Sequence, residues 1–170
     1  MAVTLTATIS ANIGWVYTSA RTGSLNIIDS ASFSFSKSLT SGTGAAGTAD
    51  LIYSAQGTIA AAGTLNLDFA GSLTDSFGTT ITMARMKYLM LQNTTDTAAS
   101  ALTVGNHANP LGIVSGTNTI SIRNGGILMM GCSDATGIAI TGGATDALKI
   151  VNADGAVTAT YQVCAIGSSA

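Results

Sequence analysis

The sequence contains very little charge. Charged residues make up 8% of the 170-residue chain, against about 25% in an ordinary soluble domain. All 8 acidic residues are aspartate, and glutamate is absent. Glu and Lys cover the exposed faces of soluble helices, so their scarcity argues against a helical architecture. A surface with so few charges is weakly solvated, and we expect it to be packed against neighbouring molecules.

Other absences limit the class of partner. A net charge of −2 provides no basic surface for nucleic acid. No apolar run reaches the roughly 18 residues that a membrane-spanning helix needs. The N-terminal MAVTLTATIS lacks the basic and apolar regions of a secretion signal. We therefore expect neither a nucleic acid nor a membrane as partner.

Residues suited to catalysis are also scarce. The single histidine, His107, lies in a predicted loop beside Asn106 and Asn109, and no recognisable nucleophile motif accompanies it. The aspartates are scattered singly, without the spacing of metal ligands. Cys132 and Cys164 stand far apart, and we expect both to be buried thiols. The sequence thus predicts no enzyme, and no catalytic, cofactor-binding or metal-binding residues.

What the chain does contain is alternation with a period of two. VTLTATI (residues 3–9) and SFSFSKSL (residues 32–39) alternate apolar with small polar side chains, which is typical of half-buried antiparallel strands. The dipeptides Asn124-Gly125 and Asp154-Gly155 separate apolar runs, as hairpin turns do. We count about ten strands with turn signals about every 8–12 residues, the spacing typical of a β-sandwich or barrel.

The expected organisation is one all-β domain with a distinct N-terminal segment. Residues 48–170 form the predicted β-sandwich. Residues 1–47 contain either an extended arm or the first strands of the sandwich, together with a glycine-rich connection. The connection is read from SGTGAAGTA (residues 41–49), whose composition predicts flexibility. If residues 1–18 are an arm, their deletion leaves the sandwich folded and weakens attachment to neighbouring subunits.

The segment TITMARMKYLMLQN (residues 80–93) is apolar but contains two of the six cations, Arg85 and Lys87. Its surroundings favour a strand covered on both sides. Both cations then lie on one face and must meet carboxylates, backbone carbonyls or an interface, because burial of an unpaired charge is very costly. We expect pairing with Asp68 or Asp75, or contact with an acidic partner surface. An unbroken strand places the following residues on one face: Ile81, Met83, Arg85, Lys87, Leu89 and Leu91.

Three blocks of the chain are informative together. They are TADLIYSAQGTIAAAGTLNLDFAGSLTDSFGTTITMARMKYLMLQNTTD, VGNHANP, and TISIRNGGILMMGCSDATGIAITGGATDALKIVNADGAVTATYQVCAIGSSA. They resemble small structural proteins of tailed-bacteriophage virions, in particular the capsid decoration, or cement, proteins. The resemblance extends over most of the chain and is looser in residues 1–47. Its motifs, such as LDFAGSL (residues 67–73), are structural and not catalytic.

The resemblance implies a jelly-roll-like β-sandwich of about ten strands that needs no active site. It implies a protein that stabilises a capsid from its outer surface, after assembly in the host cytoplasm. The implied partners are the major capsid protein and further copies of this chain, in a homodimer or homotrimer. We expect interface residues among the two cations and the N-terminal apolar side chains: Arg85, Lys87, Val3, Leu5, Ile9, Trp15 and Tyr17.

Two alternatives remain open at this point. The chain is also compatible with a receptor- or glycan-binding module of a phage tail, in which Trp15, Tyr17 and the loop of His107 would form the ligand site. A structural protein of the tail or neck is the other alternative.

Overall fold

The computed structural model describes residues 3–19, 27–96, 100–114 and 116–170. These residues form strands joined by turns and loops, and no helix occurs among them. The prediction of an all-β, sandwich-like fold is therefore confirmed. The described part of the chain forms more strands than predicted, because short strands at the ends of the sandwich lack a clear alternating pattern.

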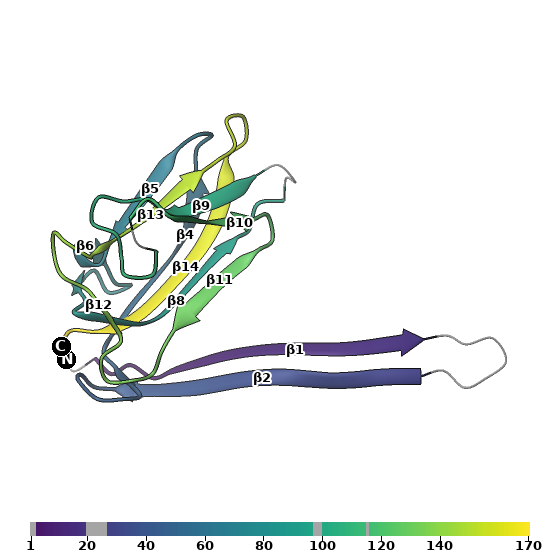
Figure 1. The fold of residues 1–170 in the computed structure, drawn as a ribbon. Coiled ribbons are helices and arrows are strands. Elements are labelled where there is room, and N and C mark those ends of the chain that lie inside the picture. The colour runs from purple at the N-terminus through teal and green to yellow at the C-terminus, as the bar shows by residue number, and fades with distance from the viewer. Residues whose placement is uncertain (1–2, 20–26, 97–99, 115) are drawn as a thin grey trace.

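Two antiparallel sheets face each other and enclose the core (Figure 1). The first, here called the β13 sheet, has the order β10-β9-β13-β5. The second, the β14 sheet, has the order β11-β8-β14-β4, with β12 also paired to β8. The β13 sheet comprises β5 (Thr64–Asp68), β9 (Ala101–Gly105), β10 (Thr119–Arg123) and β13 (Ala147–Asn152). The β14 sheet comprises β4 (Leu51–Ile59), β8 (Arg85–Asn93), β11 (Ile127–Gly131), β12 (Ile138–Ala139) and β14 (Ala159–Ser168).

The core lies between the two sheets and is built from alternate side chains of each strand. Leu89 and Leu91 of β8 point inward and are fully buried, as are Leu102 of β9 and Ile150 of β13. Each such side chain contributes about 1.5–3 kcal/mol through removal of apolar surface from water. Phe69 is also fully buried and packs edge-on against Tyr53 at a ring-centroid distance of 6.1 Å. The sandwich thus has a continuous core of its own.

The two predicted hairpin turns join strands of opposite sheets. Asn124-Gly125 leads from β10 to β11, and Asp154-Gly155 leads from β13 to β14. The hairpin prediction is therefore wrong at both places. Such a dipeptide permits a sharp change of direction, shown by φ of 71° at Gly125, but it does not determine which strand becomes the hydrogen-bonded neighbour. Among the described strands of the two sheets, only the steps from β9 to β10 and from β11 to β12 stay within one sheet.

The predicted strand over residues 80–93 is interrupted. β7 (Thr80–Thr82) pairs with β6 (Ala70–Thr74) in a small sheet of its own, whereas β8 pairs with β14. Between them, Met83 donates its amide to Phe69 at 2.9 Å. A β-bulge then places Met86 opposite Gly167 of β14. The extra residue reverses the side-chain alternation, so Met86 joins the core with Leu89, and the predicted single face is wrong.

A buried asparagine fastens one end of the sandwich. Asn152, at the end of β13, has no exposed surface. Its Nδ2 donates to the carbonyls of Ile59 and Ala60, each at 3.1 Å, and to Val157 at 2.7 Å. One side chain therefore holds together the β4–β5 turn and the β13–β14 turn.

Replacement of Asn152 by alanine is expected to destabilise the sandwich by about 2–4 kcal/mol, because buried carbonyls would lose their donor. The matched control is Asn66→Ala, at an exposed position of β5, for which we expect a loss below about 0.5–1 kcal/mol. Urea unfolding followed by far-ultraviolet circular dichroism measures both. Equal losses for the two variants would show that the hydrogen bonds of Asn152 do not hold the turns.

The N-terminal strands lie outside the sandwich. β1 (Ala7–Ser19) pairs with β2 (Ile27–Ser41) in continuous antiparallel register from Ala7 opposite Leu39 to Ser19 opposite Ile27. β2 also pairs in parallel with the short β3 (Thr48–Ala49). Figure 1 shows this hairpin extending away from one end of the sandwich. We call β1 and β2 together the arm.

The glycine-rich segment between the arm and the sandwich was predicted to be a flexible connection. In the structure it is a hydrogen-bonded turn: Thr40 donates its amide to Gly47 at 3.0 Å, and Gly42 donates to Ala49 at 3.1 Å. The amide of Gly47 also reaches the carbonyl of Ser133 at 2.7 Å. Gly47 has φ of 71°, a conformation that glycine adopts without strain. The glycines therefore serve a tight turn that is fastened to the sandwich.

Candidate interaction surface

The register of the arm separates its side chains into two unlike faces. Residues directly opposite each other in an antiparallel pair lie on the same face. One face is mainly apolar, although it also contains Asp29 and Lys37; we call it the apolar face of the arm. The other face consists largely of Ser, Thr, Asn and Gly, with Val16 and Ile28. The apolar face comprises Ile9, Ala11, Ile13, Trp15, Tyr17, Phe33, Phe35 and Leu39.

Most of the apolar face is open to solvent. Exposed fractions are 70% for Ile13, 73% for Tyr17 and 75% for Phe33. Trp15 is half-buried because its ring packs on Phe33 at a centroid distance of 5.2 Å, and its Nε1 donates to Asp29 at 3.3 Å. A two-stranded ribbon is at best marginally stable in water. A contiguous apolar strip of this kind marks a surface that a partner covers.

The base of the arm is covered by the chain itself. Ile9 and Leu39 are buried there against Tyr88 of β8 and Ile166 of β14. Leu5 is half-buried and packs on the same cluster. The contacted side chains belong to the outer face of the β14 sheet, the face directed away from the core. The apolar face of the arm therefore begins as a small second core and becomes exposed farther out.

Among the described residues, the outer face of the β14 sheet has no acidic or basic side chain in β4, β11, β14 and the part of β8 that follows Lys87; we call this part the uncharged face. It is formed by glutamines, small hydroxyls and apolar groups, and burial raises the pKa of the Cys164 thiol, which keeps that group neutral. The outer face of the β13 sheet instead has Asp68, Arg123 and Lys149. The uncharged face comprises Ile52, Ser54, Gln56, Thr58, Tyr88, Met90, Gln92, Ile127, Met129, Thr160, Gln162, Cys164 and Ile166.

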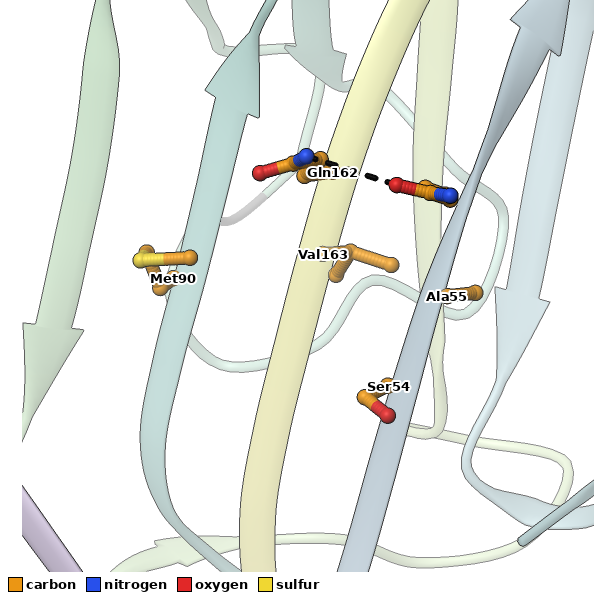
Figure 2. Close-up of a pocket in the computed structure, with 6 residues that line it drawn as sticks. Ser54, Ala55, Met90, Gln162 and Val163 are labelled. Carbon is orange, nitrogen blue, oxygen red and sulfur yellow. Dashed lines mark hydrogen bonds between the residues drawn. The ribbon is translucent and has the colours of Figure 1, made fainter. Parts of the chain in front are cut away.

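Two of the shallow depressions on the uncharged face bear on the kind of partner that fits it. Figure 2 shows the first, where the Gln162 amide donates to Gln56 across β14 and β4 at 3.4 Å, close to Met90. The second, of about 250 Å³, lies between the base of the arm and the sheet, against Ile9, Met129 and other side chains. Such relief suits a flat protein partner better than a small molecule, which needs a deeper cavity.

The structure distributes the predicted N-terminal interface residues along the arm and its base. Val3 is 67% exposed and Tyr17 is 73% exposed. Ile9 is buried at the base, so it serves the attachment of the arm and is not a free interface residue. The sequence analysis missed Phe33 and Phe35 as interface residues, although their alternation with serine in SFSFSKSL was the signal for an apolar face.

The two predicted cationic interface residues are used inside the chain. Lys87 has no exposed surface, and its Nζ donates to the carbonyls of Asp134 and Ala135. Arg85 donates from Nη1 to the same Ala135 carbonyl at 2.9 Å. Lys87 is therefore not available to a partner, and that part of the interface prediction is wrong. Backbone carbonyls of this loop therefore replace the expected carboxylates as partners of both cations.

Pairing with Asp68 or Asp75 is also not observed. Asp68 accepts a hydrogen bond from the Ala70 amide at 2.8 Å, and Asp75 accepts one from the Phe77 amide at 2.9 Å. Both carboxylates thus close local turns, a common use of aspartate.

Asp134 fixes the loop that supplies these carbonyls. Its Oδ1 accepts hydrogen bonds from the Gly137 amide at 2.6 Å and from the Thr136 hydroxyl at 2.8 Å. The backbone amide of Gly137, followed by the Thr136 hydroxyl, holds the pKa of Asp134 below its ordinary value. The carboxylate therefore stays ionised and keeps the loop in the conformation that meets Lys87.

Groups with potential for catalysis or ligation are dispersed. The Nδ1 atom of His107 accepts a hydrogen bond from the Asn109 amide at 3.0 Å, which closes its loop. Cys132 and Cys164 are free thiols, as predicted, but half-buried. No group of three or more His, Cys, Asp or Glu side chains suited to a metal occurs within the four ranges that the structure describes. Nor do these ranges contain a helix long and apolar enough to span a bilayer.

Trp15 and Tyr17 are not brought together with the His107 loop. Figure 1 places the β9–β10 loop, which contains His107, on the body of the sandwich, apart from the arm. Comparisons with known proteins found no family model, no curated protein and no solved structure that matches this chain.

Proposed function

We propose that this chain is a structural virion protein that decorates a phage capsid and stabilises it by bridging neighbouring subunits of the major capsid protein. The observation that carries the proposal is the uncovered apolar face of the arm. A chain that exposes Ile13, Tyr17 and Phe33 on a thin ribbon is incomplete by itself, and it is completed by a neighbour in an assembly.

Three further features support the proposal. The sandwich supplies a scaffold with a continuous core. The uncharged face and the low charge of the whole chain suit close contact with other protein subunits. The chain crosses between the sheets at most steps, which supports a jelly-roll winding like that of many virion proteins. The role is structural and non-enzymatic, on the outer surface of the particle.

Stabilisation of the shell follows from mass action. A protein that binds the assembled shell but not its separated subunits shifts the equilibrium toward the shell. With free protein at about 100 times its dissociation constant, each binding site gains about 2.7 kcal/mol. Many such sites on one particle give a large total effect.

Addition of the purified chain to undecorated capsids of the phage that encodes it is expected to raise the temperature at which the shells disassemble. The rise should saturate as the binding sites fill. Light scattering during heating measures the disassembly temperature, and a cryo-electron microscopy map of the decorated particles shows where the chain binds. Capsids of an unrelated phage serve as the control. A chain absent from purified particles, with no effect on shell stability, would contradict the proposal.

A receptor- or glycan-binding tail module is the second candidate function. Trp15 and Tyr17 favour it, since they are neighbouring aromatic side chains on one face of the arm. A glycan array with the purified chain distinguishes the two, because a decoration protein shows no sugar preference. A tail or neck location within the structural class is distinguished by the same particle map.

A further inference from the structure

We infer that the arm of one copy lies with its apolar face on the uncharged face of a second copy, and that the exchange is reciprocal. The inference names the partner of the surface on which the proposed function rests. A symmetric pair joined in this way presents two sandwiches to the shell, which is what bridging of neighbouring capsid subunits requires.

The base of the arm already shows that the two surfaces fit. Ile9 and Leu39, from the apolar face of the arm, are buried against Tyr88 and Ile166 of the uncharged face. Farther out, Figure 1 shows the arm diverging from its own β14 sheet. The outer part of the arm and the rest of the uncharged face therefore remain separate within one chain. A second copy supplies each surface with the partner that it already contacts at the base.

The apolar face of the arm and the uncharged face are also chemically complementary. The described residues of the uncharged face include no acidic or basic side chain that would oppose an apolar ribbon, whereas the β13 sheet presents Arg123 and Lys149. Ile127 and Met129 at the edge of the uncharged face are 59% and 38% exposed. One contact between copies covers these side chains together with Phe33 and Tyr17 of the arm. Specificity for the uncharged face follows, since burial of an unpaired charge would be costly on the other sheet.

The exposed part of the arm and the uncharged face also match in length. The exposed part of β1, residues 11–19, has the same number of residues as β8, which has 9. Both are about 30 Å long at about 3.4 Å per residue. A ribbon of that length and about 10 Å wide covers about 300 Å² on each side, so two reciprocal arms bury about 1,200 Å² in total. That area reaches the range of stable interfaces, whereas a single arm covers only half of it.

The test uses one variant on each surface, each with a matched control. Phe33→Lys introduces a charge on the apolar face of the arm, and Ser34→Lys does the same on the opposite face. Gln162→Glu introduces a charge on the uncharged face, and Asn66→Asp makes the corresponding change on the β13 sheet. All four positions are exposed, and thermal unfolding confirms that each variant folds. Sedimentation velocity and light scattering measure association.

We expect the unmodified chain and both controls to be dimers, and we expect Phe33→Lys and Gln162→Glu each to raise the dissociation constant by about tenfold or more. An equimolar mixture of these two variants should associate more strongly than either one alone. In the mixed dimer, one contact joins an unmodified arm to an unmodified face, and the other joins Lys to Glu.

Three results would overturn the inference. They are an unmodified chain that stays monomeric at tens of micromolar, a Gln162→Glu variant that dimerises normally, and a mixture no stronger than its components. The second result would indicate that arms pair with arms. A monomeric chain that still binds and stabilises capsids would reject this inference and leave the proposed function intact. A chain that forms this dimer but does not bind capsids would support the inference and contradict the proposed function.

Discussion

Replacement of residues 11–35 by a short Gly-Ser linker is expected to weaken attachment to the shell strongly while the sandwich stays folded. The excision removes the exposed part of the arm and retains Ile9 and Leu39, which pack against Tyr88 at its base. Because the main core lies between the β13 and β14 sheets, the melting temperature should change by only about 4 °C or less. Loss of the bridging contact should weaken binding to capsids by about 100-fold or more.

Co-sedimentation with capsids measures the binding, and circular dichroism measures the melting. This excision is a cleaner test than deletion of residues 1–18, which would also remove Leu5 and Ile9 from the base and leave β2 without its partner. Full-length Ser34→Lys, altered only on the polar face, is the control. If the excised chain binds capsids as the full-length chain does, the arm has no part in attachment.

Lys87→Glu is expected to destabilise the sandwich by about 3–5 kcal/mol, the cost of an uncompensated buried charge. Lys87 is fully buried, and its ammonium meets the carbonyls of Asp134 and Ala135. A carboxylate at this place would face the negative ends of those carbonyl dipoles with no donor. Lys87→Met, which removes the charge but preserves most of the volume, should lose less, about 1–3 kcal/mol, through the missing hydrogen bonds.

The matched control is Lys149→Glu, the same change of charge on the outer face of the β13 sheet, with an expected loss below about 1 kcal/mol. Urea unfolding measures all three variants. Far-ultraviolet circular dichroism is the suitable probe, because Trp15 lies on the arm and its fluorescence does not report on the core. Equal losses for Lys87→Glu and Lys149→Glu would mean that the loop moves aside and exposes residue 87 to water.

The sequence predicted the fold class because alternation at period two depends only on which side of a strand faces the core. The same pattern contained the apolar face of the arm, since residues 3–9 and 32–39 alternate most regularly. The pattern did not indicate that these strands leave the sandwich. A strand packed on a core and a strand covered by another subunit have the same alternation, because burial by a partner selects the same residues as burial within the chain.

The errors have a common physical cause, which is dependence on partners distant in the sequence. Asn124-Gly125 permits a turn, but the sheet that each flanking strand joins depends on side-chain packing across the sandwich. The bulge between Met86 and Tyr88 depends on the pairing of β8 with β14, and it inverts the predicted faces of the strand. Lys87 finds its carbonyls in a loop 47 residues away. No local pattern indicates such contacts.

The lack of acidic and basic side chains among the described residues of the uncharged face determines how contacts made there respond to salt and temperature. Attraction between opposite charges is screened by dissolved salt over a distance of about 10 Å at 0.1 M, but glutamine, methionine and aromatic rings have no such charges to screen. We therefore expect binding through this face to change little with salt concentration. Binding should weaken on cooling, because the tendency of apolar groups to leave water declines as the temperature falls.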